Sequence, residues 1–158
     1  MNRIAIIYWT NTGNTEVMAN FIKDSCEQEN NHAKLFHVNN FNPLTVNNYD
    51  VLALGCPAMG TEQIEEQEFA PMIAKIEDKL VNKGVILFGS YGWGKGKYLE
   101  ALKKRLLAKK AIIITENIIA NEYPNKFVEK QCFEAGKILV NYHAQMALKT
   151  NQKENHHE

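Results

Sequence analysis

The sequence predicts an α/β domain of three layers, an α/β/α sandwich in which helices cover both faces of a five-stranded parallel sheet. Continuous apolar segments, which are typical of strands buried on both faces, alternate with amphipathic segments of helical period. The chain has 158 residues, which suffices for one domain with a complete core but not for two domains of ordinary size.

The predicted strands are short and mostly apolar. Residues 4–7 are apolar without interruption and run into Tyr8 and Trp9, which predicts a central strand. A shorter alternating segment at residues 34–38 is typical of an edge strand. Three further apolar segments complete the predicted sheet, at residues 50–55, 84–89 and 111–114.

The predicted helices lie between and after these strands. Apolar residues at helical spacing predict helices at residues 14–28, 69–80, 97–110 and about 124–147. The final residues are polar and offer little apolar surface to bury, so we expect them to be disordered. The expected organisation is a domain at residues 1–147 followed by a tail at residues 148–158.

Right-handed crossover connections restrict how these strands can be arranged. With the first strand central and the second at an edge, the strand order is 2-1-3-4-5. Ligands then bind at the carboxyl ends of strands one and three, where the winding direction changes. Residues 10–15 and 56–67 follow these two strands, and residues 90–94 follow the next strand. We therefore expect three loops that are distant in sequence to form one pocket.

The first of these loops has the composition of an anion site. It joins a strand to a helix start, where free N–H groups and the helix dipole favour negative charge. It offers hydroxyl and amide donors but no lysine or arginine, which indicates a phosphate that is anchored rather than transferred. Its residues are Thr10, Asn11, Thr12, Gly13, Asn14 and Thr15. The alternative is an ordinary polar turn with threonine caps.

The other two loops carry side chains suited to a flat ring. Tyr91 and Trp93 stand beside glycines, which allow a backbone to approach a planar ligand closely. Met59 offers a polarisable thioether that packs well against an aromatic ring. Together with the phosphate anchor, these residues predict a clamp for a planar phosphorylated heterocycle. The alternative for Trp93 is packing into the core.

The three loops resemble those of the short-chain flavodoxins found in anaerobic bacteria. Residues 10–15 are similar to the phosphate loop of that family, T/S-x-T-G-x-T. Residues 56–62 resemble its second flavin loop and residues 89–94 its third. The resemblance covers roughly residues 3–142, with every loop in the family's order.

The resemblance implies a low-potential one-electron carrier, not an enzyme, that holds FMN without a covalent bond and shuttles electrons between redox enzymes through a neutral semiquinone. It implies that residues 10–15 bind the phosphate, that Trp93 stacks on one face of the flavin ring and that Met59 covers the other. It also implies that Glu62 accepts a hydrogen bond from ring N3–H. The other expected FMN-binding residues are Pro57, Ala58, Gly60, Thr61, Ser90, Tyr91, Gly92 and Gly94.

Four features depart from the usual member of that family: Asn11, Thr61, Lys95 and the net charge. Thr61 is β-branched, and it would be strained if the flavin-loop turn flipped to a type II turn with Thr61 at its third position, which predicts weaker stabilisation of the semiquinone. The net charge is zero where flavodoxins are usually acidic, although a local group of glutamates could attract a positively charged partner. This group comprises Glu62, Glu65, Glu66 and Glu68, and its alternative is a solvated face.

Composition narrows the remaining classes of function. A net charge of zero gives no field for nucleic acid or a membrane. Three separated cysteines argue against a disulfide frame or a zinc site, and no histidine has metal-ligand spacing. We expect a cytoplasmic monomer that meets its redox partners transiently. The alternatives are a two-electron flavin reductase or ribonucleotide-reductase activator of the same fold, and a binding module without FMN.

Overall fold

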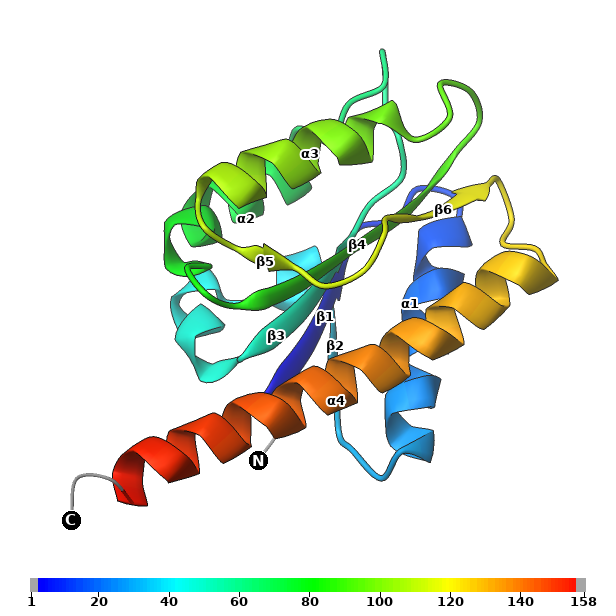
Figure 1. Cartoon of the computed structure of the whole chain (residues 1–158). Helices are drawn as coiled ribbons and strands as arrows, with labels where there is room; N and C mark the ends of the chain where they lie inside the picture. Colours follow the sequence, from blue (N-terminus) through cyan, green and yellow to red (C-terminus); the bar gives the residue numbers. More distant parts are fainter. Residues whose placement is uncertain (1–2, 156–158) are drawn as a thin grey trace.

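A computed structural model describes residues 3–155, and its strands form one parallel sheet with the order β2-β1-β3-β4-β5 (Figure 1). The predicted strand order and the α/β/α architecture are confirmed. The strands are β1 (Ile4–Tyr8), β2 (Lys34–His37), β3 (Val51–Gly55), β4 (Gly84–Tyr91), β5 (Ile112–Ile113) and β6 (Ile118–Asn121).

Two short strands occupy the fifth position of the sheet. β5 pairs with the first two residues of β4, and β6 pairs with the last four. The sequence predicted a single strand at residues 111–114 with irregular chain after it, so β6 was missed. Polar residues 115–117 interrupt the apolar pattern between the two strands. β4 has eight residues and is long enough to pair with both.

Helices cover the two faces of the sheet, with α1 and α4 on one face and α2 and α3 on the other (Figure 1). Ile4 and Ile6 of β1 pack in the core between the sheet and α1 and α4. Ala5 and Ile7 pack in the core between the sheet and α2 and α3. Every residue of β1 is buried, which confirms a central, two-sided strand. The helices are α1 (Asn14–Gln28), α2 (Phe69–Ile76), α3 (Lys97–Ala108) and α4 (Lys126–Asn155), with 3-10 helices η1 (Val38–Asn40), η2 (Pro43–Asn48) and η3 (Glu77–Lys79).

The last helix is longer than the sequence predicted. α4 continues to Asn155, whereas we expected a helix end near residue 147 and a disordered tail at residues 148–158. Residues 140–155 contain no glycine or proline and include several residues of high helix propensity, so their polarity does not end the helix. Residues 156–158 lie outside the described residues. Within residues 3–155, no helix has the length and apolar character needed to span a membrane.

A charged cluster joins α4 to the sheet at the amino ends of the strands. Arg3 donates two hydrogen bonds of 2.8 Å to the carboxylate of Asp50. Nδ1 of His143, on α4, lies 3.1 Å from Oδ2 of the same carboxylate. Burial acts to raise the pKa of Asp50, but Arg3 and His143 outweigh it, and the pKa lies below its ordinary value. This cluster lies at the end of the sheet opposite to the three predicted loops.

A buried carboxylate caps the first turn of α2. Glu65 accepts hydrogen bonds from the backbone N–H groups of Gln67 (2.6 Å), Glu68 (2.9 Å) and Phe69 (2.7 Å). These are donors that a helix start otherwise leaves without partners. Because Glu65 is only 6% exposed, its placement in a surface acidic patch was wrong.

We expect Glu65→Ala to lower the free energy of unfolding by about 2–4 kcal/mol, because one buried and two partly buried N–H groups lose their acceptor. The measurement is urea-induced unfolding of the apoprotein followed by circular dichroism. Glu66→Ala is the matched control, since Glu66 is exposed and should change stability by no more than about 0.5 kcal/mol. Equal effects of the two substitutions would contradict the capping role.

Candidate functional site

A cavity of about 450 Å³ lies where the three loops meet. It occupies the carboxyl ends of β1, β3 and β4, as the strand order predicts. The predicted residues that line it are Asn11, Thr12 and Asn14 from the first loop, Pro57, Ala58 and Met59 from the second, and Ser90, Tyr91 and Gly92 from the third.

Two residues that the sequence did not single out also line the cavity, Glu122 and Tyr123. They follow β6, whose carboxyl end lies beside that of β4. The backbone N–H of Glu122 donates to the carbonyl of Tyr91 at 2.8 Å, which holds this segment against the third loop. A strand predicted at residues 118–121 would have identified both residues, because a ligand at this edge meets the residues that follow each strand.

The amino end of α1 is open toward this site. Its N-cap, Gly13, has a φ of +101° and makes no side-chain cap hydrogen bond. The other three α-helices of residues 3–155 each have a side-chain acceptor at their amino end: Glu65 at α2, Glu62 at α3 and Asn125 at α4. The first-turn N–H groups of α1 therefore remain for a ligand, and the helix dipole favours an anion there.

The remaining residues of the first loop maintain its shape. Oγ1 of Thr10 accepts a hydrogen bond of 3.1 Å from the N–H of Gly13, which closes the loop. Oγ1 of Thr15 lies 3.2 Å from Oγ of Ser90, and both side chains are buried. This contact fixes the start of α1 against the end of β4. The cavity-lining side chains of this loop are therefore those of Asn11, Thr12 and Asn14.

The second loop is a short antiparallel turn. Met59 and Gln63 exchange backbone hydrogen bonds of 2.8 and 2.9 Å. The left-handed residues of this turn are Gly60 (φ +54°) and Glu62 (φ +62°). Thr61 is not among them, so this conformation of the turn does not strain its β-branched side chain, and the strain predicted for the flipped turn stays a prediction. Gly60 adopts its conformation without steric cost.

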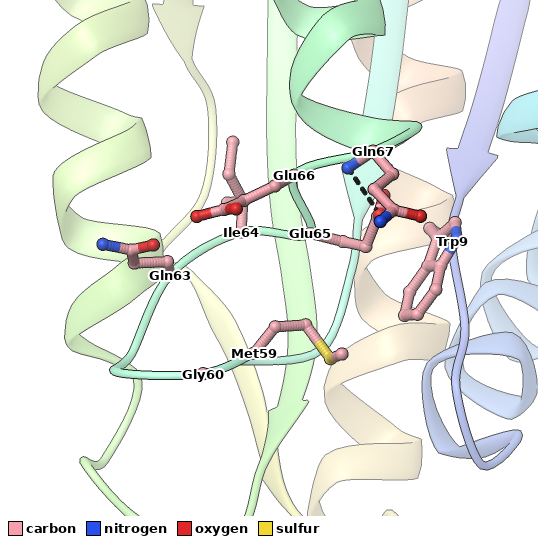
Figure 2. Close-up of a pocket in the computed structure, with 8 residues that line it drawn as sticks. All are labelled: Trp9, Met59, Gly60, Gln63, Ile64, Glu65, Glu66 and Gln67. Carbon is pink, nitrogen blue, oxygen red and sulfur yellow. Dashed lines mark hydrogen bonds between the residues drawn. The ribbon is translucent and has the colours of Figure 1, made fainter.

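Met59 separates the cavity described above from a second hollow, of about 380 Å³, beside Trp9. Figure 2 shows the thioether of Met59 between the turn and the indole of Trp9. Glu65 and Gln67 lie on the same side, joined by the capping hydrogen bond. The indole of Trp9 therefore lines a hollow next to Met59, the residue that we expect to cover one face of the flavin ring.

The carboxylate of Glu62 is held between the second and third loops. Its Oε2 accepts a hydrogen bond of 3.1 Å from the backbone N–H of Tyr98, and its Oε1 is buried without a protein partner. A Cβ on Gly94 would lie 2.1 Å from the carboxylate carbon of Glu62. Gly94 has a φ of +86°, a left-handed conformation that favours glycine, and its missing side chain leaves room for the Glu62 carboxylate.

Several predicted ring-binding residues do not line this cavity. Gly60, Thr61, Glu62, Trp93 and Gly94 are not among the residues that line the cavity. The indole of Trp93 is 65% exposed, so the alternative of core packing is wrong. An exposed indole beside glycines can move over a ligand at little cost.

The predicted acidic patch is largely buried. Glu62 and Glu65 point inward, so its exposed part reduces to Glu66, with Glu68 half-buried.

Cys56 precedes the second loop and is buried, and burial raises its pKa to about 12. It is therefore a neutral thiol rather than a reactive thiolate. No group of three potential metal ligands is found among the described residues.

The strand order and a pocket at the reversal of winding define a doubly wound α/β protein of the flavodoxin-like type. Comparison with known proteins agrees. The family model for flavodoxin matches residues 6–136. The flavodoxin of Clostridium beijerinckii is 38% identical over 136 residues, which cover 86% of this chain and 98% of that protein. The flavodoxin of Megasphaera elsdenii is 39% identical over 134 residues, with 85% and 96% covered.

Solved structures lead to the same family. The solution structure of two-electron reduced Megasphaera elsdenii flavodoxin matches with a TM-score of 0.81 at 38% identity, covering 87% of this chain and 98% of that chain. The rubredoxin:oxygen oxidoreductase of Desulfovibrio gigas matches with a TM-score of 0.80 at 20% identity over 37% of its length, which shows the fold alone. The chain belongs to the flavodoxin family.

We expect Gly94→Ala to lower the free energy of unfolding of the apoprotein by about 1–3 kcal/mol, because alanine is strained at this φ and its Cβ meets the Glu62 carboxylate. Gly92→Ala is the control, since a Cβ at Gly92 meets nothing within 4 Å. Urea-induced unfolding of both variants is the measurement. If both lose the same stability, the packing of Glu62 over Gly94 does not contribute to it.

Proposed function

We propose that this flavodoxin holds FMN in the cavity at the carboxyl ends of β1, β3 and β4 and carries electrons one at a time between redox enzymes. Members of the family are FMN-bound electron carriers, and the chain shares that function. The observation that supports the placement is the open amino end of α1 beside the cavity, with neutral donors around it. The chain needs no acid–base residues for this function, since FMN itself accepts and releases the electrons.

The phosphate would bind at the first loop. The first-turn N–H groups of α1 have no side-chain acceptor, and Asn11, Thr12 and Asn14 offer amide and hydroxyl donors from the cavity wall. Residues 10–15 contain no basic side chain. A phosphate held there keeps its own negative charge and is stabilised by oriented dipoles rather than by an ion pair.

The flavin ring would lie between the second and third loops. Met59 would cover its inner face and Trp93 its outer face. The unpartnered Oε1 of Glu62 is the one buried acceptor at this edge that can take a ring N–H, since its Oε2 is already bonded to Tyr98. Apolar contacts on both faces exclude water and make added negative charge on the ring costly, which favours a low potential for the second electron.

Partner enzymes would approach the rim of this cavity. Trp93 and Tyr123 are 65% and 64% exposed there, so an incoming protein can come close to the ring. We propose that the protein is a monomer in the cytoplasm. Because its net charge is zero and its acidic patch is small, we expect its encounters with partner enzymes to depend only weakly on ionic strength. Such contacts suit a carrier that must bind and release its partners quickly.

An anaerobic reductive titration of the FMN-loaded protein tests this function. Visible absorption is recorded during the titration. We expect uptake of two electrons in two separated one-electron steps, because the apolar faces around the ring make the second electron more costly to add than the first. Free FMN titrated under the same conditions is the control. A single two-electron step would support the reductase alternative, and failure of the apoprotein to take up FMN would reject the proposed function.

A further inference from the structure

Tyr98 joins both flavin loops through three hydrogen bonds. It lies in the first turn of α3 and is 3% exposed. Its hydroxyl donates to the carbonyl of Cys56 at 2.7 Å and lies 3.3 Å from the carbonyl of Ser90. Its backbone N–H donates to Oε2 of Glu62 at 3.1 Å. One residue thus contacts the start of the second loop, the start of the third loop and the acidic side chain between them.

The surrounding chain leaves space for this hydroxyl. A Cβ on Gly89 would lie 2.1 Å from both the Tyr98 hydroxyl and the carbonyl oxygen of Cys56. The absence of a side chain at Gly89 therefore allows the phenol to reach the carbonyls at the ends of β3 and β4. Buried carbonyls need a donor, and without the phenol that of Cys56 would lose this one.

The phenol is a permanent donor. Burial, together with nearby Cys56 and Glu62, raises the pKa of Tyr98 above its ordinary value. It therefore stays protonated at every pH at which the protein is expected to work.

We propose that Tyr98 is a positioning residue for the flavin ring, an inference that rests on the proposed function. Its hydroxyl fixes the two points at which the second and third loops leave the sheet. Its N–H occupies one oxygen of Glu62 and so directs the other, Oε1, to accept the ring N–H. Tyr98 makes no hydrogen bond to the phosphate loop itself and reaches it only through Ser90, so we expect its main effect on the ring.

The test compares FMN with riboflavin, which has the same ring but no phosphate. We expect Tyr98→Phe to weaken the binding of both ligands by the same factor, about tenfold, because the lost hydrogen bonds position the ring alone. The measurement is quenching of flavin fluorescence on titration with apoprotein. We also expect a shifted visible absorption band of bound flavin, since the environment of the ring changes.

Two variants serve as controls. Tyr49→Phe removes a hydroxyl from another buried tyrosine of the same core, remote from the cavity, and should leave both affinities within about twofold of the unmodified protein. Asn14→Ala alters the phosphate loop and should weaken FMN but not riboflavin. Together they separate ring positioning from general destabilisation and from phosphate binding.

The inference is overturned if Tyr98→Phe binds riboflavin as tightly as the unmodified protein, or if it weakens FMN alone. Should Tyr98→Phe not fold, Tyr98→Trp takes its place, because it keeps a large buried ring but lacks the hydroxyl that reaches the carbonyls of Cys56 and Ser90. Equal losses for both ligands in that variant support the inference, and unchanged riboflavin binding overturns it. If the unmodified protein binds neither ligand, the proposed function fails instead.

Discussion

The backbone N–H groups at a helix start must find acceptors, and this constraint organises the end of the sheet where the site lies. Glu65 meets it for α2, Glu62 for α3 and Asn125 for α4. α1, which follows the central strand, has Gly13 as its N-cap. Thr10 accepts the N–H of Gly13, but the N–H groups of the first turn have no side-chain acceptor. The chain thus supplies its own acceptors to three helices and leaves the fourth to a ligand. This difference supports the proposed phosphate position more strongly than pocket shape does.

Hydrogen bonds made by polar side chains hold the same region together. Thr15 bonds to Ser90, and Tyr98 connects the carbonyls of Cys56 and Ser90. These contacts link the start of α1 and the first turn of α3 to the ends of β3 and β4, so the loops are positioned before any ligand binds. A site positioned in this way spends little binding energy on ordering the protein, which helps it to hold a cofactor tightly.

The sequence allowed the strand order and the three loops to be predicted because both depend on local patterns: apolar runs, then polar or glycine-rich loops. It did not reveal Glu122 and Tyr123, because β6 is short and isolated from β5 by polar residues. It placed Glu65 on the surface, since a lone glutamate gives no sign that its carboxylate folds back onto its own helix start. The φ values around Thr61 depend on tertiary contacts of the turn, which the sequence does not show. The full length of α4 follows from helix propensity that continues through a polar segment.

In the proposed site the FMN phosphate lies on the open amino end of α1 among neutral donors. The second pKa of a free phosphate monoester is about 6. Oriented N–H groups and the helix dipole favour the dianion, so we expect the phosphorus-31 resonance of bound FMN to show no titration between about pH 5 and about pH 8. A resonance that titrates near the pKa of free FMN would place the phosphate in solvent and contradict this account.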